Sequence, residues 1–180
     1  MAMSEQTAPD LPAVCDAGPL IHLDEIGYAG LLAGFSPLLA PERVMLEART
    51  FRLPEGLPLK VVSVSDSARA ALLPRLTTRL DPGEIDALAL NRMYPSAVFL
   101  TDDLRARAEA KNLGLRVHGS VGIIVRASRT NLLSCDQADK ALSLLASCQT
   151  LFVSSAVIDI GREQLRQGRD PGILNPDTKR

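Results

Sequence analysis

Short apolar runs along the chain alternate with longer stretches in which apolar residues recur every three or four positions. The apolar runs and one alternating segment predict five strands: Ala13–Cys15, Pro37–Ala40, Leu59–Ser65, Ala97–Leu100 and Leu115–Val117. Helical spacing fills the intervals between them. Strands that alternate with helices are typical of a three-layer α/β domain on a mainly parallel sheet. We therefore predict an α/β fold of this kind.

Capping residues and prolines mark where several helices begin or break. Asp81-Pro82-Gly83-Glu84 and Ser134-Cys135-Asp136-Gln137 both show the spacing of a capping box. A helix from about Ser67 to Arg79 contains Pro74, which predicts a kink or break. The other predicted helices include Leu20–Gly27, Tyr28–Phe35, Pro41–Phe51, one after Asp103, one after Ser120 and a last one at Ser155–Gln167.

The chain of 180 residues is long enough to bury a sizeable core in one domain. Hydrophobic residues make up 46% of it and aromatic residues 3%. A core of aliphatic side chains favours helices packed on a sheet over an aromatic-rich barrel. We expect a single domain over residues 13–167, with flexible tails at 1–12 and 168–180.

Charge, cysteine usage and hydropathy bound the compartment. The net charge of −1 gives no overall basic field of the kind that attracts nucleic acid. Cys15, Cys135 and Cys148 are far apart and odd in number, which predicts buried thiols in a reducing cytosol instead of disulfides or a zinc site. Because no long apolar run or signal segment is present, we expect a cytoplasmic protein without membrane contact.

Carboxylates stand where the predicted strands end. Asp16 follows the first strand, Asp102 and Asp103 follow the fourth, and Glu84 begins the helix before the fourth. In open α/β sheets, ligands bind beyond the carboxyl ends of the strands. Each acid also has a structural explanation: Asp16 in a turn, Glu84 in its capping box, and the aspartate pair in the first turn of a helix capped by Thr101.

Glu47 has a weaker structural explanation. Val44, Glu47, Ala48 and Phe51 stand at i, i+3, i+4 and i+7, which predicts a carboxylate within an apolar helix face. A charge buried there is costly unless it pairs with an arginine or binds a metal. Both explanations remain open for Glu47 at this point.

Together, the acids point to a cation. Several carboxylates at one sheet edge repel each other unless a positive ion lies among them. Mg²⁺ and Mn²⁺ suit carboxylate and water ligands, and such ions activate water for phosphodiester hydrolysis. If the acids converge, the sequence therefore indicates a Mg²⁺ or Mn²⁺ site.

A family resemblance is carried by four segments in order: CDAGPLIHL, APERVMLEA, DPGEIDALAL and FLTDDLRARAEAKNLGLRVHGSVGIIVRA. These resemble PIN-domain proteins, and more narrowly the prokaryotic subfamily of predicted nucleic-acid-binding proteins that contain a PIN domain. The resemblance covers about Val14–Ser128 and extends toward residue 167. It implies a Rossmann-like α/β/α sandwich with C-terminal helices and a Mg²⁺- or Mn²⁺-dependent ribonuclease.

The resemblance also implies roles for single residues. The catalytic acids that it implies are Asp16, Glu47, Glu84 and Asp103. The metal ligands that it implies are Asp16, Glu84, Asp102 and Asp103. Asp86 competes with Glu84 for the third position, and Asp103 is the better candidate of the aspartate pair.

Two departures from the family pattern are visible. Gly18 stands where many members have Ser or Thr, so a hydroxyl that would steady the metal shell is missing. The segment Leu53–Arg79 is longer than in compact toxin-type members.

The resemblance further implies the toxin of a toxin–antitoxin pair, with RNA as substrate and a cognate antitoxin as partner. We also expect a homodimer.

The densest basic run follows the aspartate pair. Its residues are Arg105, Arg107, Lys111, Arg116, Arg126 and Arg129. They either contact RNA phosphates or form a solvated helix face. At His118–Gly122, Ser120 is a candidate helix cap, and the helix start there is a candidate phosphate site. With two tyrosines and no tryptophan, recognition of RNA shape or backbone is favoured over stacking.

Two other functions compete with the nuclease. One is a non-catalytic PIN-like module that binds RNA or protein. The other is a receiver-like phosphoacceptor domain, which needs paired acids after the first strand and a lysine after the last. Asp16 stands alone and Leu115–Ser120 contains no lysine, which disfavours the receiver. Neither His22 nor His118 has a nucleophile partner in the sequence, so Ser–His and Cys–His hydrolases are not predicted.

Overall fold

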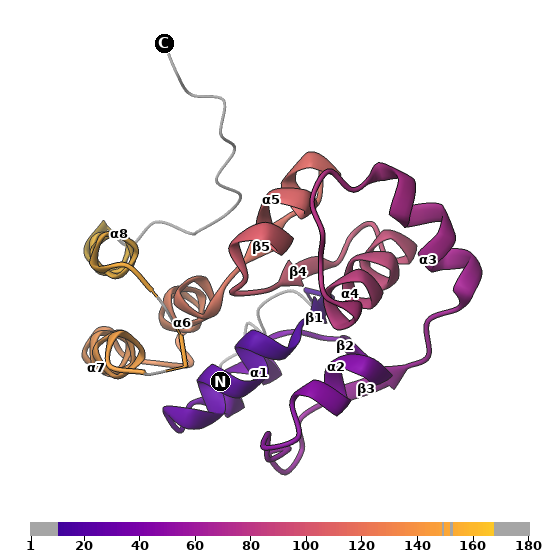
Figure 1. Ribbon diagram of the computed structural model, residues 1–180. Coiled ribbons are helices and arrows are strands. Elements are labelled where there is room, and N and C mark those ends of the chain that lie inside the picture. Colours follow the sequence, from indigo (N-terminus) through magenta and orange to yellow (C-terminus); the bar gives the residue numbers. More distant parts are fainter. Residues whose placement is uncertain (1–10, 149, 152, 168–180) are drawn as a thin grey trace, which may run out of the picture.

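The computed structural model describes residues 11–148, 150–151 and 153–167 (Figure 1). Its strands are β1 (Ala13–Cys15), β2 (Leu38–Pro41), β3 (Leu59–Val62), β4 (Val98–Leu100) and β5 (Val117–His118). Its α-helices are α1 (Ala17–Glu25), α2 (Glu42–Glu47), α3 (Asp66–Leu72), α4 (Pro82–Met93), α5 (Leu104–Asn112), α6 (Ser120–Arg129), α7 (Cys135–Ala146) and α8 (Ser155–Gln167). Two short 3₁₀ helices are η1 (Ala29–Gly34) and η2 (Leu73–Arg75).

The strands form one parallel sheet in the order β3-β2-β1-β4-β5. The chain moves outward from β1 to β3 and then returns to the other side of β1 with β4. This reversal puts the ends of β1 and β4 side by side, with Cys15 opposite Leu100. Asp16 and Thr101, which follow these residues, therefore leave the sheet together at the edge where α/β folds bind ligands.

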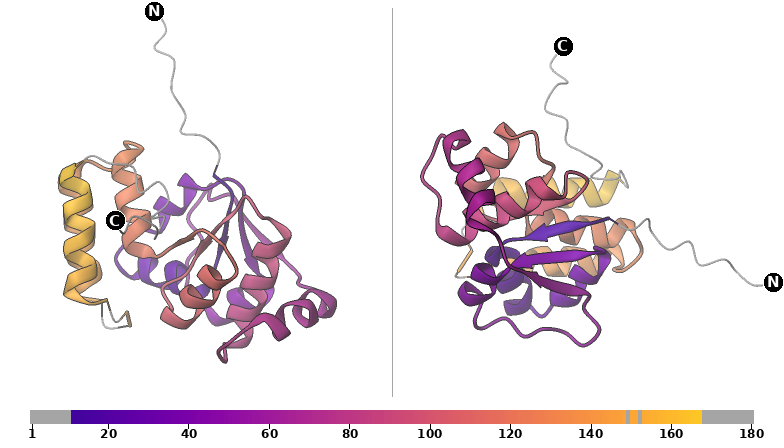
Figure 2. Two further views of the ribbon diagram at one scale, coloured as in Figure 1. Left: turned by 90° about the horizontal axis from the view of Figure 1, so that it is seen from above. Right: turned by 90° about the vertical axis from the view of Figure 1, so that its right-hand side faces the viewer.

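Helices cover both faces of the sheet (Figures 1 and 2). α4 packs on β1, β2 and β4, while α1, η1 and α6 pack against one another on the opposite side. The buried core is built from aliphatic side chains, to which Phe35 and Phe99 add two buried rings. The predicted α/β fold, with its mainly parallel sheet and its C-terminal helices, is confirmed.

The third predicted helix is shorter than expected. α2 ends at Glu47 because Ala48 leaves the helical conformation, with φ −82° and ψ 44°. The prediction of a helix over Pro41–Phe51 is therefore wrong in its second half. Tyr28–Phe35 is helical as predicted, but as the 3₁₀ helix η1.

The third predicted strand also ends early. β3 ends at Val62, where Leu59–Ser65 was expected to be extended throughout. Ser65 serves a different purpose, because its hydroxyl accepts a hydrogen bond from the backbone N–H of Ala68 at 3.2 Å and so caps α3. The predicted break at Pro74 is confirmed, since α3 gives way to η2 there.

A buried glutamate holds the loop between η2 and α4. Oε1 of Glu109, on α5, accepts hydrogen bonds from the backbone N–H and the hydroxyl of both Thr77 and Thr78, at 2.7–3.0 Å. Burial alone would raise the pKa of Glu109, but these donors outweigh it and lower the pKa. Glu109 thereby fixes the chain segment that leads into α4.

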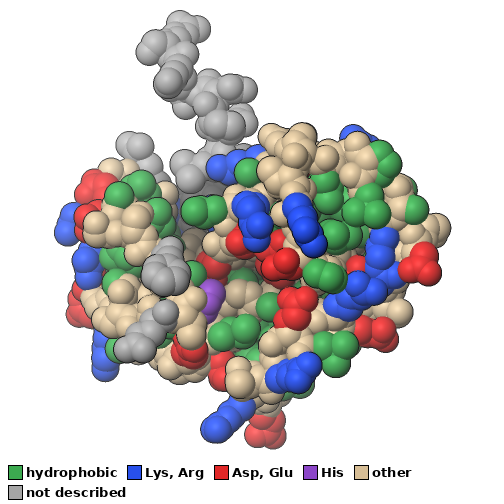
Figure 3. Space-filling view, in the orientation of Figure 1, with side chains coloured by type: hydrophobic (Ala, Val, Ile, Leu, Met, Phe, Trp, Pro, Cys, Tyr) green, Lys and Arg blue, Asp and Glu red, His purple; other side chains and the backbone are tan. Residues whose placement is uncertain are grey.

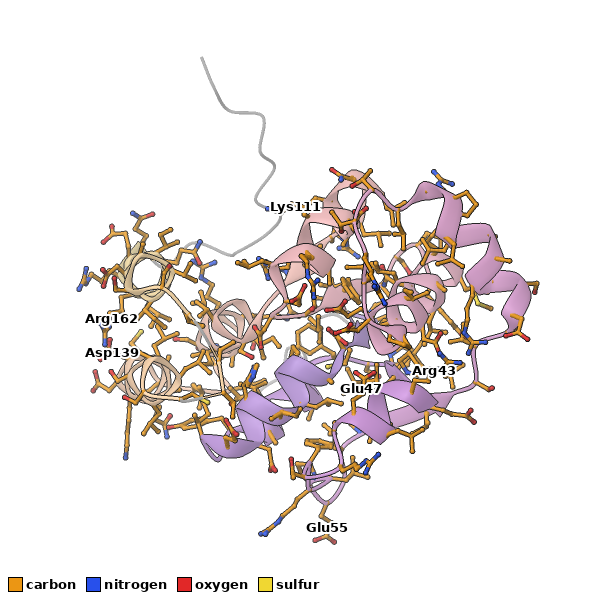
Figure 4. The ribbon with its side chains drawn as sticks, viewed as in Figure 1. Arg43, Glu47, Glu55, Lys111, Asp139 and Arg162 are labelled. Carbon is orange, nitrogen blue, oxygen red and sulfur yellow. The ribbon has the colours of Figure 1, made fainter. Side chains whose placement is uncertain are left out.

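The C-terminal helices α7 and α8 pack on α6 (Figure 1). The predicted capping box of α7 is confirmed, because the Ser134 hydroxyl accepts from the backbone N–H of Gln137 at 3.2 Å while the Gln137 side chain accepts from the backbone N–H of Ser134 at 2.8 Å. Arg162 of α8 donates to Asp139 of α7 at 2.9 Å, and Figure 4 shows the two side chains facing each other.

The cysteines do not share one environment. Cys15 is buried in β1, and its burial raises the pKa of its thiol. Cys135 is exposed because it opens α7 on the solvent side, and Cys148 is half-buried in the loop after α7, so the prediction of three buried thiols is wrong for these two. The Cys148 thiol donates to Glu25 Oε2 at 2.6 Å.

The predicted tails fall mostly outside the described residues, which exclude 1–10 and 168–180. Leu11 and Pro12 are already joined to the fold, because their carbonyls accept hydrogen bonds from the backbone N–H groups of Ser36 and Val98. Within the described part of the chain, no helix has the length and apolar character needed to span a membrane.

Candidate metal centre

A cavity of about 480 Å³ opens where β1 and β4 end. The acids that line it are Asp16, Glu47, Asp81, Glu84, Asp102 and Asp103. Figure 3 shows acidic side chains gathered in a hollow near the centre of one face of the molecule. The structure thus brings together at one sheet edge the acids that the sequence places after its strands, with Asp86 outside the lining.

Asp16 is the most deeply buried of these acids, with 4% of its surface exposed. Its Oδ2 accepts a hydrogen bond from the hydroxyl of Thr101 at 2.8 Å, across the β1–β4 seam. Its Oδ1 is buried and has no hydrogen-bond partner in the described part of the chain. Burial raises the pKa of Asp16 to about 6, although the Thr101 hydroxyl and the backbone N–H of Ala17 oppose the shift.

Glu84 lies in the first turn of α4. Its Oε2 accepts from the backbone N–H of Asp81 at 2.7 Å, so the predicted capping box is present. Burial raises the pKa of Glu84 to about 7, and the nearby negative charges of Asp103 and Asp16 add to the shift. The cavity therefore holds two carboxyls that lack compensating positive charge.

Asp103 is the N-cap of α5. Its Oδ1 accepts from the backbone N–H groups of Arg105 and Ala106, each at 2.8 Å. The prediction that Thr101 caps this helix is therefore wrong, because its hydroxyl accepts from the backbone N–H of Asp103, which precedes the helix, and donates to Asp16. Asp103 Oδ2 makes no hydrogen bond to any residue in the described ranges.

Asp102 joins three elements. Its Oδ2 accepts from His22 Nδ1 on α1 at 2.8 Å and from the Ser120 hydroxyl on α6 at 2.6 Å. Its Oδ1 accepts from the backbone N–H of Ser120 at 2.7 Å. Both oxygens are thus engaged by the protein. The candidate phosphate site at the start of α6 is already filled by Asp102, and the N-cap there is Gly119 instead of the predicted Ser120.

Glu47 is exposed, so the prediction of a carboxylate buried within an apolar face is wrong. Because α2 ends at Glu47, its side chain turns toward the start of α4, where Oε1 accepts from the backbone N–H of Gly83 at 3.1 Å. A Cβ at position 83 would overlap this carboxylate, so the close approach requires glycine. Figure 4 shows Glu47 and Arg43 on the same helix.

Asp86 is turned away from the cavity. Its carboxylate pairs with Arg69 of α3, with Oδ2 2.9 Å from Nη2, and lies 3.5 Å from Arg43 Nε. It is 2% exposed. The burial and the pairing explain Asp86 as the anchor of α3 on α4, which leaves Glu84 as the acid of this helix that faces the cavity.

Four of the six residues of the basic run, Arg105, Arg107, Lys111 and Arg126, have different surroundings. Arg105 lines the cavity. Arg107 donates to the carbonyl of Thr101 at 3.1 Å, and Arg126 lies over the ring of Phe35. Lys111 lies near the far end of α5 (Figure 4). Arg107 also interacts electrostatically with Asp102, so Arg105 and Arg107 are the members of this set that lie beside the acids.

The donor set suits a hard divalent cation. Within the described residues, no group of three or more His, Cys, Asp or Glu side chains already stands at the spacing of a metal site. The buried Oδ1 of Asp16 nevertheless lacks a hydrogen-bond partner in the same residues, and burial among like charges raises the pKa values of Asp16 and Glu84, which a bound cation would lower. Carboxylate oxygens are the ligands that Mg²⁺ and Mn²⁺ prefer.

Two contacts at the site were missed by sequence reasoning. The hydroxyl of Thr101 orients Asp16, and the ring of His22 holds Asp102. Thr101 carries a weak signal, because parallel pairing of the two strands would place it beside Asp16. His22 carries no such signal, because it lies 80 residues from Asp102 along the chain and only the fold brings the two side chains together.

A family model described as a PIN domain, DUF3368, matches residues 12–165. Comparisons with curated proteins and with solved structures gave no match. The matched region contains the sheet, every acid of the cavity and most of the C-terminal helices. Because it spans well over half of the chain, this protein belongs to the PIN-domain family DUF3368.

Proposed function

We propose that this protein is a divalent-metal-dependent endoribonuclease that hydrolyses phosphodiester bonds of RNA. Asp16 carries the proposal, because its buried Oδ1 lacks a partner in a cavity shared with Glu84 and Asp103. A buried carboxylate oxygen is costly without a hydrogen-bond donor or a positive charge beside it, and a bound cation supplies the charge. PIN domains are typically metal-dependent nucleases, which supports the same chemistry.

Asp16, Glu84 and Asp103 are the residues that we expect to hold Mg²⁺ or Mn²⁺. Each has one oxygen engaged within the protein and a second that makes no hydrogen bond in the described part of the chain. When bound, the ion activates water and stabilises the charge that develops on the leaving oxygen. Thr101, the backbone of Asp81 and the start of α5 hold the three carboxylates in place.

Asp102 and Glu47 have other roles in this proposal. Asp102 is a positioning residue, since its two oxygens are taken up by His22 and Ser120. Glu47 lies at the mouth of the cavity with one oxygen held by Gly83, and its exposed carboxylate is the candidate general base. Arg105, on the cavity wall, is the candidate contact for a substrate phosphate.

Cleavage of labelled RNA with Mg²⁺, Mn²⁺ or EDTA tests the proposal. We expect metal-dependent cleavage that falls by roughly 10²-fold or more in Asp16→Asn and in Asp103→Asn, as when a catalytic carboxylate is lost. Asp66→Asn is the matched control, because the Asp66 side chain on α3 is fully exposed, and this variant should keep the wild-type rate. Robust cleavage by both cavity variants would refute the proposal, and RNA binding without cleavage under any divalent ion would support a non-catalytic module.

The toxin role is a separate proposal that rests on the resemblance. Expression of the wild type should arrest growth and expression of Asp16→Asn should not. Co-expression of a small DNA-binding antitoxin encoded next to the gene should relieve the arrest.

We also propose a homodimer, for which light scattering of the purified protein should give twice the mass of the 19.3 kDa chain.

A further inference from the structure

The acids share their cavity with other side chains. It is also lined by His22 on α1 and by Thr150 and Leu151 after α7. His22 lies on the helix that starts directly after Asp16. Its ring contacts Asp102, the neighbour of Asp103, so a strand held at the acids would bring a ribose close to His22.

The ring of His22 has one nitrogen committed and one available. The residue is 8% exposed, and its Nδ1 lies 2.8 Å from Asp102 Oδ2. That oxygen also accepts from the Ser120 hydroxyl at 2.6 Å. Because a carboxylate only accepts, Nδ1 must carry the hydrogen. The other nitrogen, Nε2, has no partner in the described part of the chain, and the ring lines the cavity.

The charges around His22 disfavour a phosphate at this end. Asp102 contacts the ring, and Glu25, on the same helix, interacts with it electrostatically. Glu25 accepts hydrogen bonds from the Cys148 thiol and the Thr150 hydroxyl, which lower its pKa and keep it ionised. Arg107 offsets the charge of Asp102, so a phosphate beside Nε2 would be repelled mainly by Glu25, whereas a neutral hydroxyl would face no such repulsion.

We infer that His22 Nε2 binds a ribose 2′-hydroxyl and thereby makes the site select RNA over DNA. The 2′-hydroxyl is both a donor and an acceptor, and it is the group that distinguishes RNA from DNA. It therefore pairs with Nε2 whether that nitrogen donates or accepts. The inference rests on the proposed function, because it assumes that nucleic acid enters the cavity. Asp102 and Ser120 are the positioning residues that orient the ring.

Equilibrium binding of fluorescent oligonucleotides tests the inference. The full-length chain carries Asp103→Asn so that binding with Mg²⁺ is measured without cleavage. The ligands are an RNA, the DNA of the same sequence, and RNAs with one 2′-deoxy nucleotide at successive positions. We expect RNA to bind about tenfold more tightly than DNA, the size of one hydrogen bond to a substrate hydroxyl. One deoxy position should account for most of this ratio.

Three variants at His22 and one control separate recognition from structure. His22→Ala and His22→Asn should bring the RNA-to-DNA ratio close to one, since Asn reaches only the position of Nδ1. His22→Gln should retain part of the ratio, because its amide reaches the position of Nε2. Asp66→Asn, whose fully exposed side chain on α3 lies outside the cavity lining, is the control and should keep the ratio. The melting temperature of each variant reports any purely structural effect.

The outcomes distinguish this inference from the proposed function. An unchanged RNA-to-DNA ratio in His22→Ala, or equal losses of RNA and DNA binding in all His22 variants, would overturn the inference alone. RNA binding with the expected ratio in a wild type that never cleaves would support the inference and refute the nuclease. A protein that binds neither nucleic acid would overturn both.

Discussion

Replacing Asp16 by asparagine should stabilise the metal-free protein at neutral pH. The pKa of Asp16 is raised from 3.8 to about 6 by burial. As the pH rises, the Asp16 carboxyl ionises at a lower pH in the unfolded chain than in the folded protein. The free energy of unfolding therefore falls as the pH rises from about 4 to about 6. At about 1.4 kcal/mol for each pKa unit, the ionised carboxylate costs on the order of 3 kcal/mol at pH 7. Asparagine remains neutral and keeps an oxygen for the Thr101 hydroxyl.

Urea unfolding in EDTA at pH 4.0 and pH 7.5 measures this effect. The variant and the wild type should have nearly equal free energies of unfolding at the lower pH. At the higher pH the variant should be more stable by up to about 3 kcal/mol. Saturating Mg²⁺ should then stabilise the wild type and leave the variant unchanged. A variant that is less stable at pH 7.5 in EDTA, or a difference that does not depend on pH, would refute the reasoning.

Three further substitutions test other contacts. Glu109→Ala removes the acceptor of four hydrogen bonds and should lower the free energy of unfolding by about 3 kcal/mol in a urea titration. A loss below about 1 kcal/mol would mean that other contacts hold the loop between η2 and α4. Gly83→Ala displaces the Glu47 carboxylate, which a Cβ at position 83 would overlap. The cleavage rate should fall by about tenfold or more without a lower melting temperature. An unchanged rate would exclude Glu47 from catalysis. Asp86→Asn breaks the buried pair with Arg69 and should cost about 3 kcal/mol of stability. The Mg²⁺ affinity of Asp86→Asn, measured by calorimetry, should stay within about twofold of wild type, because Asp86 lies outside the cavity lining. A loss as large as that of Asp16→Asn would instead make Asp86, and not Glu84, the metal-binding acid of α4.

The location of the site could be predicted from the sequence because strand ends are visible in it. Asp16 and the pair Asp102 and Asp103 stop apolar runs, and the parallel sheet brings those stops to one edge. Glu84 was placed correctly at the start of α4 for a similar reason, since its capping box is a local pattern.

The division of labour among the acids could not be predicted. Asp102 and Asp103 are neighbours, yet one holds α1 and α6 while the other caps α5. The partners of Asp102 lie 80 and 18 residues away, and their positions depend on the packing of whole helices. The error at Glu47 has a local origin, because helical spacing was extended past Ala48, where the backbone turns out of the helix.

The hydroxyl that orients Asp16 comes from Thr101, directly after β4, whereas position 18 on α1 carries a glycine. In this chain the end of the strand, not the helix, therefore orients the buried carboxylate. Position 18 is then constrained by room alone, because a Cβ there would lie 3.3 Å from Asp102 Cβ. A side chain larger than that of glycine at position 18 would therefore press on Asp102, whose two oxygens hold α1 and α6.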